Sequence, residues 1–412
     1  MGKWIIMACR NIFRNRRRSF VTLAAIAVGF AAITLFRGYT DNTYEGLRES
    51  AIRGEGLGHL SVFKKGWKEH GAMDPKAFLL SPDDVRTIMD VAGAEPRVIL
   101  GTPELHISGL VSNGSLSTVF LAKGVVPGDE KIIQGAWAST RPVTGNLLSD
   151  DRPHGVEMAK DLAANLDLKP GSDAVILSNT LDGQMNALGV EVSGIYNTGT
   201  SATNDKYMRI PFAYAQELYD TDRADRVILL LDHWKSTGPV RERLEQALAR
   251  SGLDVEIRTW TELSTFYNQV RGMFTMIFTF IFSIVLVIVV MSVINTMGMA
   301  VLERTREIGT LRALGLKRRG VSTVFALEGG LLGLVGCLAG LGVTVAVWGM
   351  ILFAGPSYTP PGSSSSVALI VNLVPRDMAM LTLFLVGLSL MAAILPARRA
   401  ARQSIVEALG HT

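Results

Sequence analysis

Residues Val301–Gly320 read VLERTREIGTLRALGLKRRG, and this stretch decides how the rest of the chain is organised. Eight of its residues are charged, and five of the eight are arginines. An uncharged run, 272–302, precedes most of it, and another begins at Gly329. A short basic segment between two membrane-length runs is typical of a cytoplasmic loop, because positively charged loops are retained on that side. The stretch therefore predicts a cytoplasmic loop at 303–328.

The same stretch has the periodicity of a helix. Ile308, Leu311 and Leu314 recur at helical spacing opposite several basic side chains, and Gly315 is well placed to end the helix. We expect a short amphipathic helix against the cytoplasmic membrane surface. From periodicity alone, a helix that only anchors the loop and a helix that docks on a partner fit equally well.

Four runs without a charged residue are long enough to cross a hydrocarbon core of about 30 Å. We predict four transmembrane helices, an external loop at 355–377, and a large α+β domain at 37–271 between the first two spans. The second run would form a helix of about 45 Å and project beyond the bilayer. The predicted spans are 20–36, 272–302, 329–354 and 378–397.

The distribution of charge predicts which side each part faces. Residues 1–19 hold six basic residues and no acidic one, and the tail 398–412 is also basic. The overall net charge of +4 leaves −7 on residues 37–271. We therefore expect both termini in the cytoplasm and the large domain outside. Segment 2–16 fits either an interfacial amphipathic helix or an unstructured basic tail. Its arginines adjoin a span and would face lipid headgroups, so we expect no nucleic-acid partner.

Within the large domain, local patterns predict alternating strands and helices. Ser81-Pro82-Asp83-Asp84 is a helix start, with serine as the N-cap and proline at the first helical position. Residues 95–150 are rich in β-formers and turn residues and suggest a β-rich insertion. Residues 155–172 predict a helix followed by a Pro-Gly turn. The other predicted elements are strands at 58–63, 173–178, 188–196, 226–231 and 253–258, and helices at 211–220 and 238–250.

Glycines mark the third span as a site of close helix packing. Gly329 and Gly333 form one pair at small-xxx-small spacing, and Gly336 and Gly340 form another. Such pairs let two backbones approach closely. General glycine enrichment in membrane helices is the alternative interpretation.

Motifs of common chemistries are absent from the sequence. It has no G-x-x-x-x-G-K-[ST], no H-E-x-x-H and no G-x-S-x-G pattern, and its only cysteines are Cys9 and Cys337. We therefore expect no nucleotide, metal or other cofactor on this chain and no enzymatic activity of its own. The uncharged spans favour work through movement of the external domain, or lateral handling of a lipophilic substrate.

Two motifs and one longer run resemble a known family. ERTREIGTLRALG is similar to the signature of the FtsX-like permeases of ABC transporters, and PARRAARQSIVEAL at 396–409 is similar to the closing motif of the same superfamily. The run beginning GVEMAKDLA at Gly155 resembles the periplasmic core of MacB-like permeases, and the size of the external domain favours the branch that contains MacB and LolC/LolE. The resemblance implies a porter-like lobe and a β-rich lobe in the external domain, and a bacterial inner-membrane location.

The resemblance also assigns a role to the 303–328 loop. It implies a coupling helix that docks into a separate ATPase dimer carrying ATP and Mg²⁺, with a second permease copy or paralogue completing the complex. A periplasmic adaptor or a lipoprotein carrier is a further candidate partner. The implied interface residues are Glu303, Arg304, Glu307, Ile308, Leu311, Arg312, Leu314 and Gly315.

Two functions are compatible with that resemblance. One is release of lipoproteins or export of hydrophobic compounds. The other is an FtsX-like relay of ATPase motion to an extracytoplasmic partner such as a cell-wall hydrolase. The size of the 37–271 domain favours the first, because the external domain of FtsX itself is much smaller.

Overall fold

The computed structural model describes residues 16–71, 73–135, 142–199, 201–360 and 366–402. These residues form two compact units. We call them the helical unit, which comprises Met1–Tyr44, Val270–Ser357 and Ala368–Thr412, and the α+β unit, which comprises Glu45–Gln269 and Tyr358–Val367. The predicted interfacial segment 2–16 lies, except for Arg16, outside the described residues.

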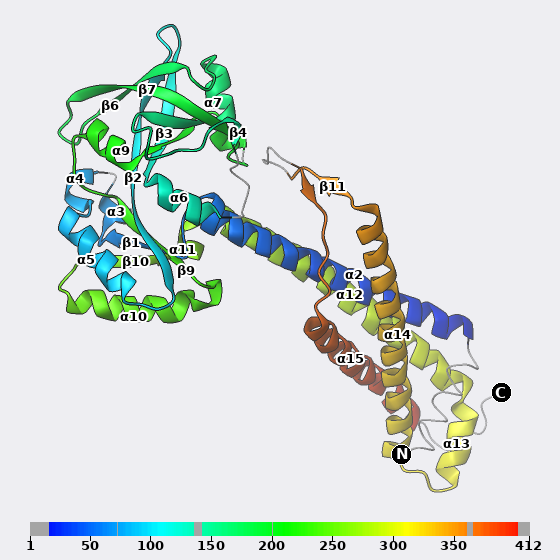
Figure 1. Cartoon of the computed structure of the whole chain (residues 1–412). Helices are drawn as coiled ribbons and strands as arrows, with labels where there is room; N and C mark the ends of the chain where they lie inside the picture. Colours follow the sequence, from blue (N-terminus) through cyan, green and yellow to red (C-terminus); the bar gives the residue numbers. More distant parts are fainter. Residues whose placement is uncertain (1–15, 72, 136–141, 200, 361–365, 403–412) are drawn as a thin grey trace. The chain divides into compact units, whose positions relative to one another are not determined.

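Four helices are long and apolar enough to cross a membrane, as predicted. Each is longer than the uncharged run that predicted it, because polar residues continue the helix at one or both ends. A fifth, short helix lies between the second and third (Figure 1). The helices are α2 (Arg16–Glu49), α12 (Thr265–Glu303), α13 (Thr305–Ala313), α14 (Arg318–Ala354) and α15 (Pro375–Arg402), and a short ribbon of β11 (Ser357–Tyr358) and β12 (Val367–Ala368) follows α14.

The helical unit has one apolar core to which all five helices contribute. Polar contacts join α2 to the first turn of α15 and to the segment before it. Arg37 Nε donates to Asp377 Oδ2 over 2.7 Å, and the Asn372 amide donates to the Gly38 carbonyl over 3.1 Å. These two contacts therefore hold this part of α2 against the start of α15 through polar groups.

The α+β unit is built on a single extended set of paired strands. Its strands are β1 (Leu60–Lys64), β2 (Val98–Ser112), β3 (Ser117–Val125), β4 (Pro142–Gly145), β5 (Gly155–Ala159), β6 (Asp173–Asn179), β7 (Met185–Tyr196), β8 (Tyr207–Pro211), β9 (Arg226–Leu231) and β10 (Val255–Thr259). Its helices are η1 (Ser50–Gly54), α3 (Trp67–His70), α4 (Pro75–Phe78), α5 (Pro82–Gly93), α6 (Pro127–Gln134), α7 (Lys160–Asn165), α8 (Ser201–Asn204), α9 (Phe212–Tyr219), η2 (Trp234–Ser236), α10 (Thr237–Arg250) and α11 (Trp260–Leu263).

The first lobe of this unit is an antiparallel sheet in the order β10-β1-β9-β2, with α5 and α10 contributing to its core. The predicted start of α5 is confirmed. The Asp84 amide donates to Ser81 Oγ over 3.1 Å, and the Ser81 amide donates to Asp84 Oδ2 over 3.0 Å. This capping box satisfies two amides that the helix itself leaves without acceptors.

The second lobe is a closed barrel. Strand pairs run β2-β3-β8-β5-β7-β6 and return to β2, so that Leu110 of β2 lies opposite both Val119 of β3 and Leu177 of β6. Its interior is a continuous apolar cluster. The fifteen-residue strand β2 belongs to both lobes, first to the sheet and then to the barrel (Figure 1). Closure removes the exposed strand edges that an open sheet would carry.

The structure corrects several predicted boundaries. The barrel extends well beyond 95–150 and includes strands up to Pro211, because β2 leaves the sheet partway along its length. The predicted helix 155–172 begins as the buried strand β5 and is helical only over α7. Within the predicted β-rich range 95–150, Pro127 and Gly128, two typical turn residues, form the first turn of α6. The helix of the second span, α12, begins well before residue 272, and Ser264 separates it from α11.

His59 is a buried titratable group next to the first lobe. It is 5% exposed, and its Nδ1 accepts a hydrogen bond from the Leu231 amide over 3.0 Å. Burial, with nearby Arg53, lowers the pKa of His59 from 6.5 to about 4. The imidazole is therefore neutral in the folded domain at neutral pH.

We predict that the α+β unit loses stability as the pH falls through this range. Because the folded pKa is depressed, the stabilisation is complete above pH 6.5 and is lost as the pH falls towards 4, with about 2 kcal/mol lost by pH 5. His59→Asn keeps an acceptor near the Leu231 amide but does not titrate. Its thermal midpoint, followed by circular dichroism, should fall less between pH 7 and pH 5 than that of the wild type. Equal falls would contradict the assignment.

Candidate functional site

The predicted loop 303–328 contains the short helix α13, held between two tight junctions, and its residues from Arg318 onward already belong to α14. Arg304 alone joins α12 to α13, and Thr305 Oγ1 donates to the Val301 carbonyl over 3.0 Å. After α13 the chain turns at Gly315, whose φ of +99° is easily accessible only to glycine. The Leu316 amide then donates to the Leu311 carbonyl over 3.0 Å, and α14 begins at Arg318. The chain between the two spans is therefore almost entirely helical.

Arg304 is buried, and this corrects its predicted place at an exposed interface. It is 6% exposed, and its Nη1 lies 3.3 Å from Oε2 of Glu328, which is 3% exposed. A lone arginine or carboxylate in this position would be costly, so the two charges stabilise each other. The pair connects the start of α13 to α14. An acidic residue directly before an uncharged run was the available sequence signal for Glu328.

The predicted apolar stripe divides into two parts. Ile308 is 6% exposed and belongs to the core of the helical unit, so it is not available to a partner as the stripe implied. Leu311 is 41% exposed and Leu314 is 80% exposed. A helix this close to the bundle must turn one apolar side inward, and periodicity does not identify which residue that is. The outer face of α13 keeps Glu307, Leu311 and Leu314.

The remaining predicted interface residues lie around this face. Glu303 is exposed and forms an ion pair with Arg18 of α2, at 2.6 Å. Arg312 is half-buried, and Gly315 is exposed at the turn. The structure therefore brings Glu303, Glu307, Leu311, Leu314 and Gly315 to accessible positions and turns Arg304 and Ile308 inward. We call the accessible set, with half-buried Arg312, the coupling surface.

The four glycines of α14 lie where the helix meets two neighbours. A Cβ at Gly329 would collide with Ala393 of α15, and one at Gly333 would lie 2.8 Å from Ser389 Oγ of the same helix. A turn further on, a Cβ at Gly336 would lie 2.7 Å from Ile26 of α2. At Gly340 it would lie 2.8 Å from the Ala27 carbonyl oxygen, also of α2. The first pair therefore faces α15 and the second pair faces α2.

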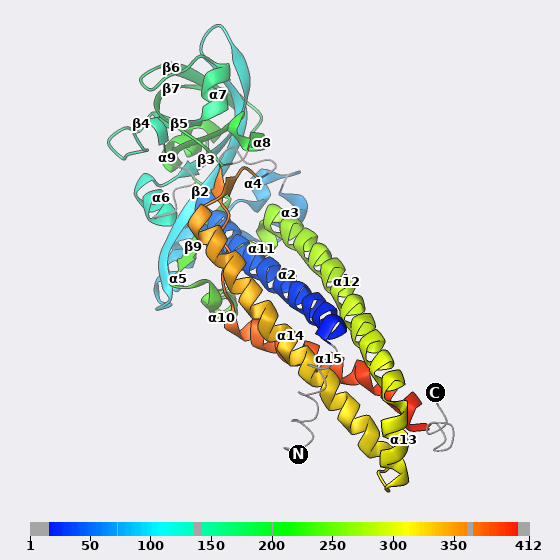
Figure 2. The same ribbon diagram turned by 90° about the vertical axis from the view of Figure 1, so that its right-hand side faces the viewer.

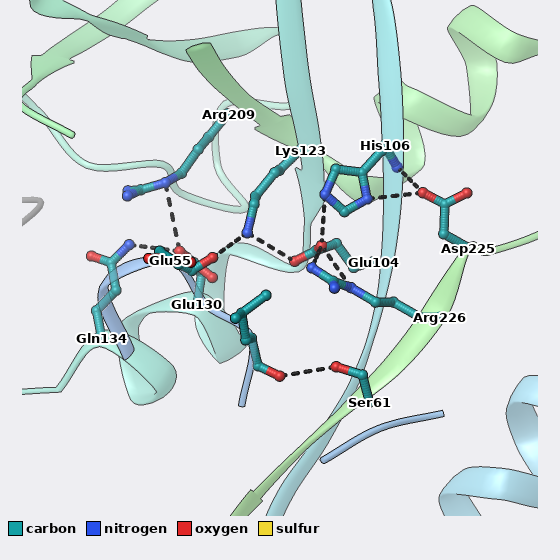
Figure 3. A network of polar contacts seen from close by, with 11 residues as sticks. Glu55, Ser61, Glu104, His106, Lys123, Glu130, Gln134, Arg209, Asp225 and Arg226 are labelled. Atoms are coloured by element: carbon teal, nitrogen blue, oxygen red, sulfur yellow. Dashed lines mark hydrogen bonds and ion pairs between the residues drawn. The ribbon is translucent and has the colours of Figure 1, made fainter. Parts of the chain in front are cut away.

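The α+β unit contains a polar cluster of its own, separate from the Arg304–Glu328 pair (Figure 3). The sequence did not predict this cluster, because its members lie far apart in the chain. Arg226 Nε of β9 donates to Glu104 Oε1 of β2 over 3.0 Å. His106 lies between two carboxylates, with Nε2 3.1 Å from Glu104 and Nδ1 2.9 Å from Asp225. Lys123 lies 3.6 Å from Glu104. This part of the cluster lies where β2 passes from sheet to barrel.

A neighbouring part of the cluster centres on buried Arg209. Its Nη1 donates to Glu157 Oε2 over 3.0 Å, its Nε lies 3.6 Å from Glu130, and its guanidinium lies over the Tyr196 ring at 4.3 Å. Burial raises the pKa of Glu130, and the nearby Arg209 and Lys123 only partly oppose it. At Glu104 burial also acts to raise the pKa, but Arg226, Lys123 and His106 together hold it at about 2. These paired charges indicate a structural role between the lobes.

Comparison with known proteins identifies the class. The family model described as the MacB-like periplasmic core domain matches residues 19–247, more than half of the chain, and the model described as the FtsX-like permease C-terminal matches 279–405. Together with four membrane-length helices, these matches define a membrane permease with a periplasmic domain. The chain belongs to the FtsX-like family of ABC transporter permeases, in the MacB-like group.

Individual relatives are distant but extend over nearly the whole chain. PvdT of Pseudomonas fluorescens, a pyoverdine export ATP-binding/permease protein, is 25% identical over 98% of this chain and 58% of its own length. The macrolide export ATP-binding/permease protein MacB of Bradyrhizobium diazoefficiens is 26% identical over 98% of this chain and 59% of its own. The chain thus spans less than two thirds of these two relatives. The lipoprotein-releasing system transmembrane protein LolC of Xylella fastidiosa is 24% identical over 96% of this chain and 95% of its own length.

Among solved structures, the periplasmic region of MacB from Actinobacillus actinomycetemcomitans is similar to this chain. The alignment covers 52% of this chain and 93% of the MacB chain. The TM-score is 0.38 and the sequence identity is 15%.

We predict that Gly340→Ala destabilises the helical unit and that Gly342→Ala does not. The new methyl group at position 340 would meet the backbone of α2, whereas nothing lies within 4 Å of the position at 342. Overpacking of a rigid contact costs about 1–3 kcal/mol. Thermal melting of the two purified variants in detergent is the measurement. Equal midpoints would show that α14 and α2 do not approach this closely.

We also predict that Glu328→Gln destabilises the chain by about 3–5 kcal/mol, because it leaves the Arg304 charge buried without its partner. The same melting assay measures the loss. The double variant Arg304→Met with Glu328→Met removes both charges and should recover most of the stability. If the single variant melts like the wild type, Arg304 does not depend on Glu328.

Proposed function

We propose that this chain is the permease subunit of a complex in which a separate ATPase dimer acts on the coupling surface and thereby moves the periplasmic domain. In this proposal both termini and α13 lie in the cytoplasm, and a second permease copy or paralogue completes the complex. LolC, of which this chain spans 95%, is named as a transmembrane protein of a releasing system, which supports a separate ATPase subunit.

The observation that carries the proposal is the construction of α13. Its outer face offers Glu307, Leu311 and Leu314 to a partner, while Ile308 is embedded in the core of the helical unit. The Arg304–Glu328 pair adds a fixed point on α14. A helix that only anchored a loop at the membrane surface would not need a buried ion pair. Force applied to the outer face of α13 would therefore move α12 and α14 as well, because these contacts limit independent movement of α13.

The length of α12 supports transmission beyond the bilayer. It has 39 residues and hence a length of about 58 Å, roughly twice the thickness of the hydrocarbon core. Because helical hydrogen bonds make such an element stiff along its axis, displacement at its cytoplasmic end would reach the far end.

For the substrate, we propose a lipophilic cargo, either a lipoprotein or a hydrophobic compound. The runs 20–36, 272–302, 329–354 and 378–397 hold no charged residue that could serve a polar solute. The names of these relatives refer to lipoprotein release, macrolide export and pyoverdine export, and the first two fit such a cargo. The match to the MacB-like periplasmic core favours this over a relay to a cell-wall hydrolase.

We predict that Leu311→Asp and Glu307→Lys each uncouple the permease from its ATPase. A carboxylate at position 311 would enter an apolar contact without a partner, and the lysine would reverse a charge on the same face, so we expect affinity to fall about ten-fold or more. The measurement is co-purification of the ATPase subunit, together with ATP hydrolysis and transport in proteoliposomes.

Asp254→Lys is the control for this experiment. Asp254 is an exposed residue of the α+β unit whose carboxylate pairs with Lys65 at 3.1 Å, so its reversal should leave ATPase association intact. Normal association and full transport in both the Leu311→Asp and Glu307→Lys proteins would reduce α13 to a topological anchor.

A further inference from the structure

A groove of about 640 Å³ lies between the first turns of α14 and the last turns of α15. Its rim carries Arg318 and Arg319 from α14 and Arg398 and Arg402 from α15. Away from these helix ends, the groove is also lined by Leu327, Leu390 and Ile394, which we call its apolar floor. The two helix ends meet because α14 and α15 are antiparallel, with Gly329 against Ala393 and Gly333 against Ser389 (Figure 2).

We propose that this groove binds one anionic glycerophospholipid, with its phosphate held by the arginines and its acyl chains against the apolar floor. The site lies on the α14–α15 face, and its residues are not part of the coupling surface on α13. The inference therefore goes beyond the proposed function and does not require that function to hold.

The charge of the groove is the first argument. Within the part of the chain that the structure describes, no carboxylate pairs with any of the four guanidinium groups. These four arginines are exposed, whereas the buried Arg209, Arg226 and Arg304 each face at least one carboxylate. Four like charges at one groove repel one another, and a bound phosphate would remove that repulsion.

The helix ends supply a second argument. The first turn of α14 contains no acidic residue, and Lys317 makes no side-chain cap. The amides of this turn therefore lack a side-chain acceptor, and the positive end of the helix dipole adds to the charge of Arg318 and Arg319. This arrangement disfavours two arginines unless an anion lies nearby.

The apolar floor identifies the source of the phosphate. A free phosphate or a nucleotide would contact the rim alone and would make no contact with Leu327, Leu390 and Ile394. A phospholipid fills both parts, because its headgroup and chains have the same polar-to-apolar order as the groove. Basic pockets between membrane helices are suited to such headgroups.

The test compares two charge-matched double variants of the full chain in neutral detergent. Arg319→Gln with Arg398→Gln removes two charges from the rim. Lys317→Gln with Arg399→Gln removes two charges from neighbouring exposed positions that do not line the groove. General attraction to anionic lipid depends on net charge and falls equally in both, so the difference between them reports the groove.

The probes are short-chain phosphatidylglycerol, short-chain phosphatidylcholine and glycerol 3-phosphate, titrated by native mass spectrometry. We expect saturable binding of phosphatidylglycerol to the wild type, weaker by about ten-fold or more in the rim variant and by less than about two-fold in the control. Phosphatidylcholine and glycerol 3-phosphate should bind far more weakly. Arg319→Lys with Arg398→Lys keeps the charge and should retain most of the binding.

Three outcomes would overturn the proposal. Equal loss in the two charge-matched variants would mean that only net charge matters. Glycerol 3-phosphate binding as tight as that of phosphatidylglycerol would assign the arginines to a free phosphate. Unchanged lipid binding with loss of a co-purifying ATPase subunit would assign them to a protein contact. If the rim variant does not fold, Arg398→Gln against Arg399→Gln makes the same comparison with one charge.

Discussion

The close approach of α14 to its two neighbours is the contact on which the helical unit depends. Helices in lipid gain little from the hydrophobic effect when they associate, so direct packing must hold them together. Glycine at positions 329 and 333 removes side chains facing α15, and glycine at 336 and 340 does the same towards α2. Since α14 also carries Glu328 and the junction with α13, its position determines where the coupling surface lies.

In both units, the buried polar groups described here have a hydrogen-bonding or oppositely charged partner. In the helical unit Arg304 and Glu328 neutralise each other, and Thr34 and Thr344 share a hydrogen bond of 2.9 Å. In the α+β unit Glu104 is held ionised by three basic groups at the point where β2 passes between lobes. Each of these contacts joins two different elements of its unit and therefore restricts how those elements can move separately.

Local features of the fold were predictable, whereas pairings were not. The capping box at Ser81 and the four apolar helices follow from spacing and composition that are visible within a few residues. The closure of the barrel depends on β2 meeting β6, whose residues 110 and 177 share no local signal. Periodicity marked Ile308 and Leu311 as one stripe, but the neighbouring bundle decides that one faces inward and the other outward.

The arginines of the helical unit show why pairing, and not charge alone, distinguishes their roles. Arg304 has a buried carboxylate within 3.3 Å, so its charge is already neutralised within the fold and its loss would be felt as instability. Arg318, Arg319, Arg398 and Arg402 face one groove without such a carboxylate among the described residues. A fold gains no stability from gathering unneutralised like charges. Their convergence beside an apolar floor is therefore best understood through a ligand that supplies both the missing negative charge and the missing apolar surface.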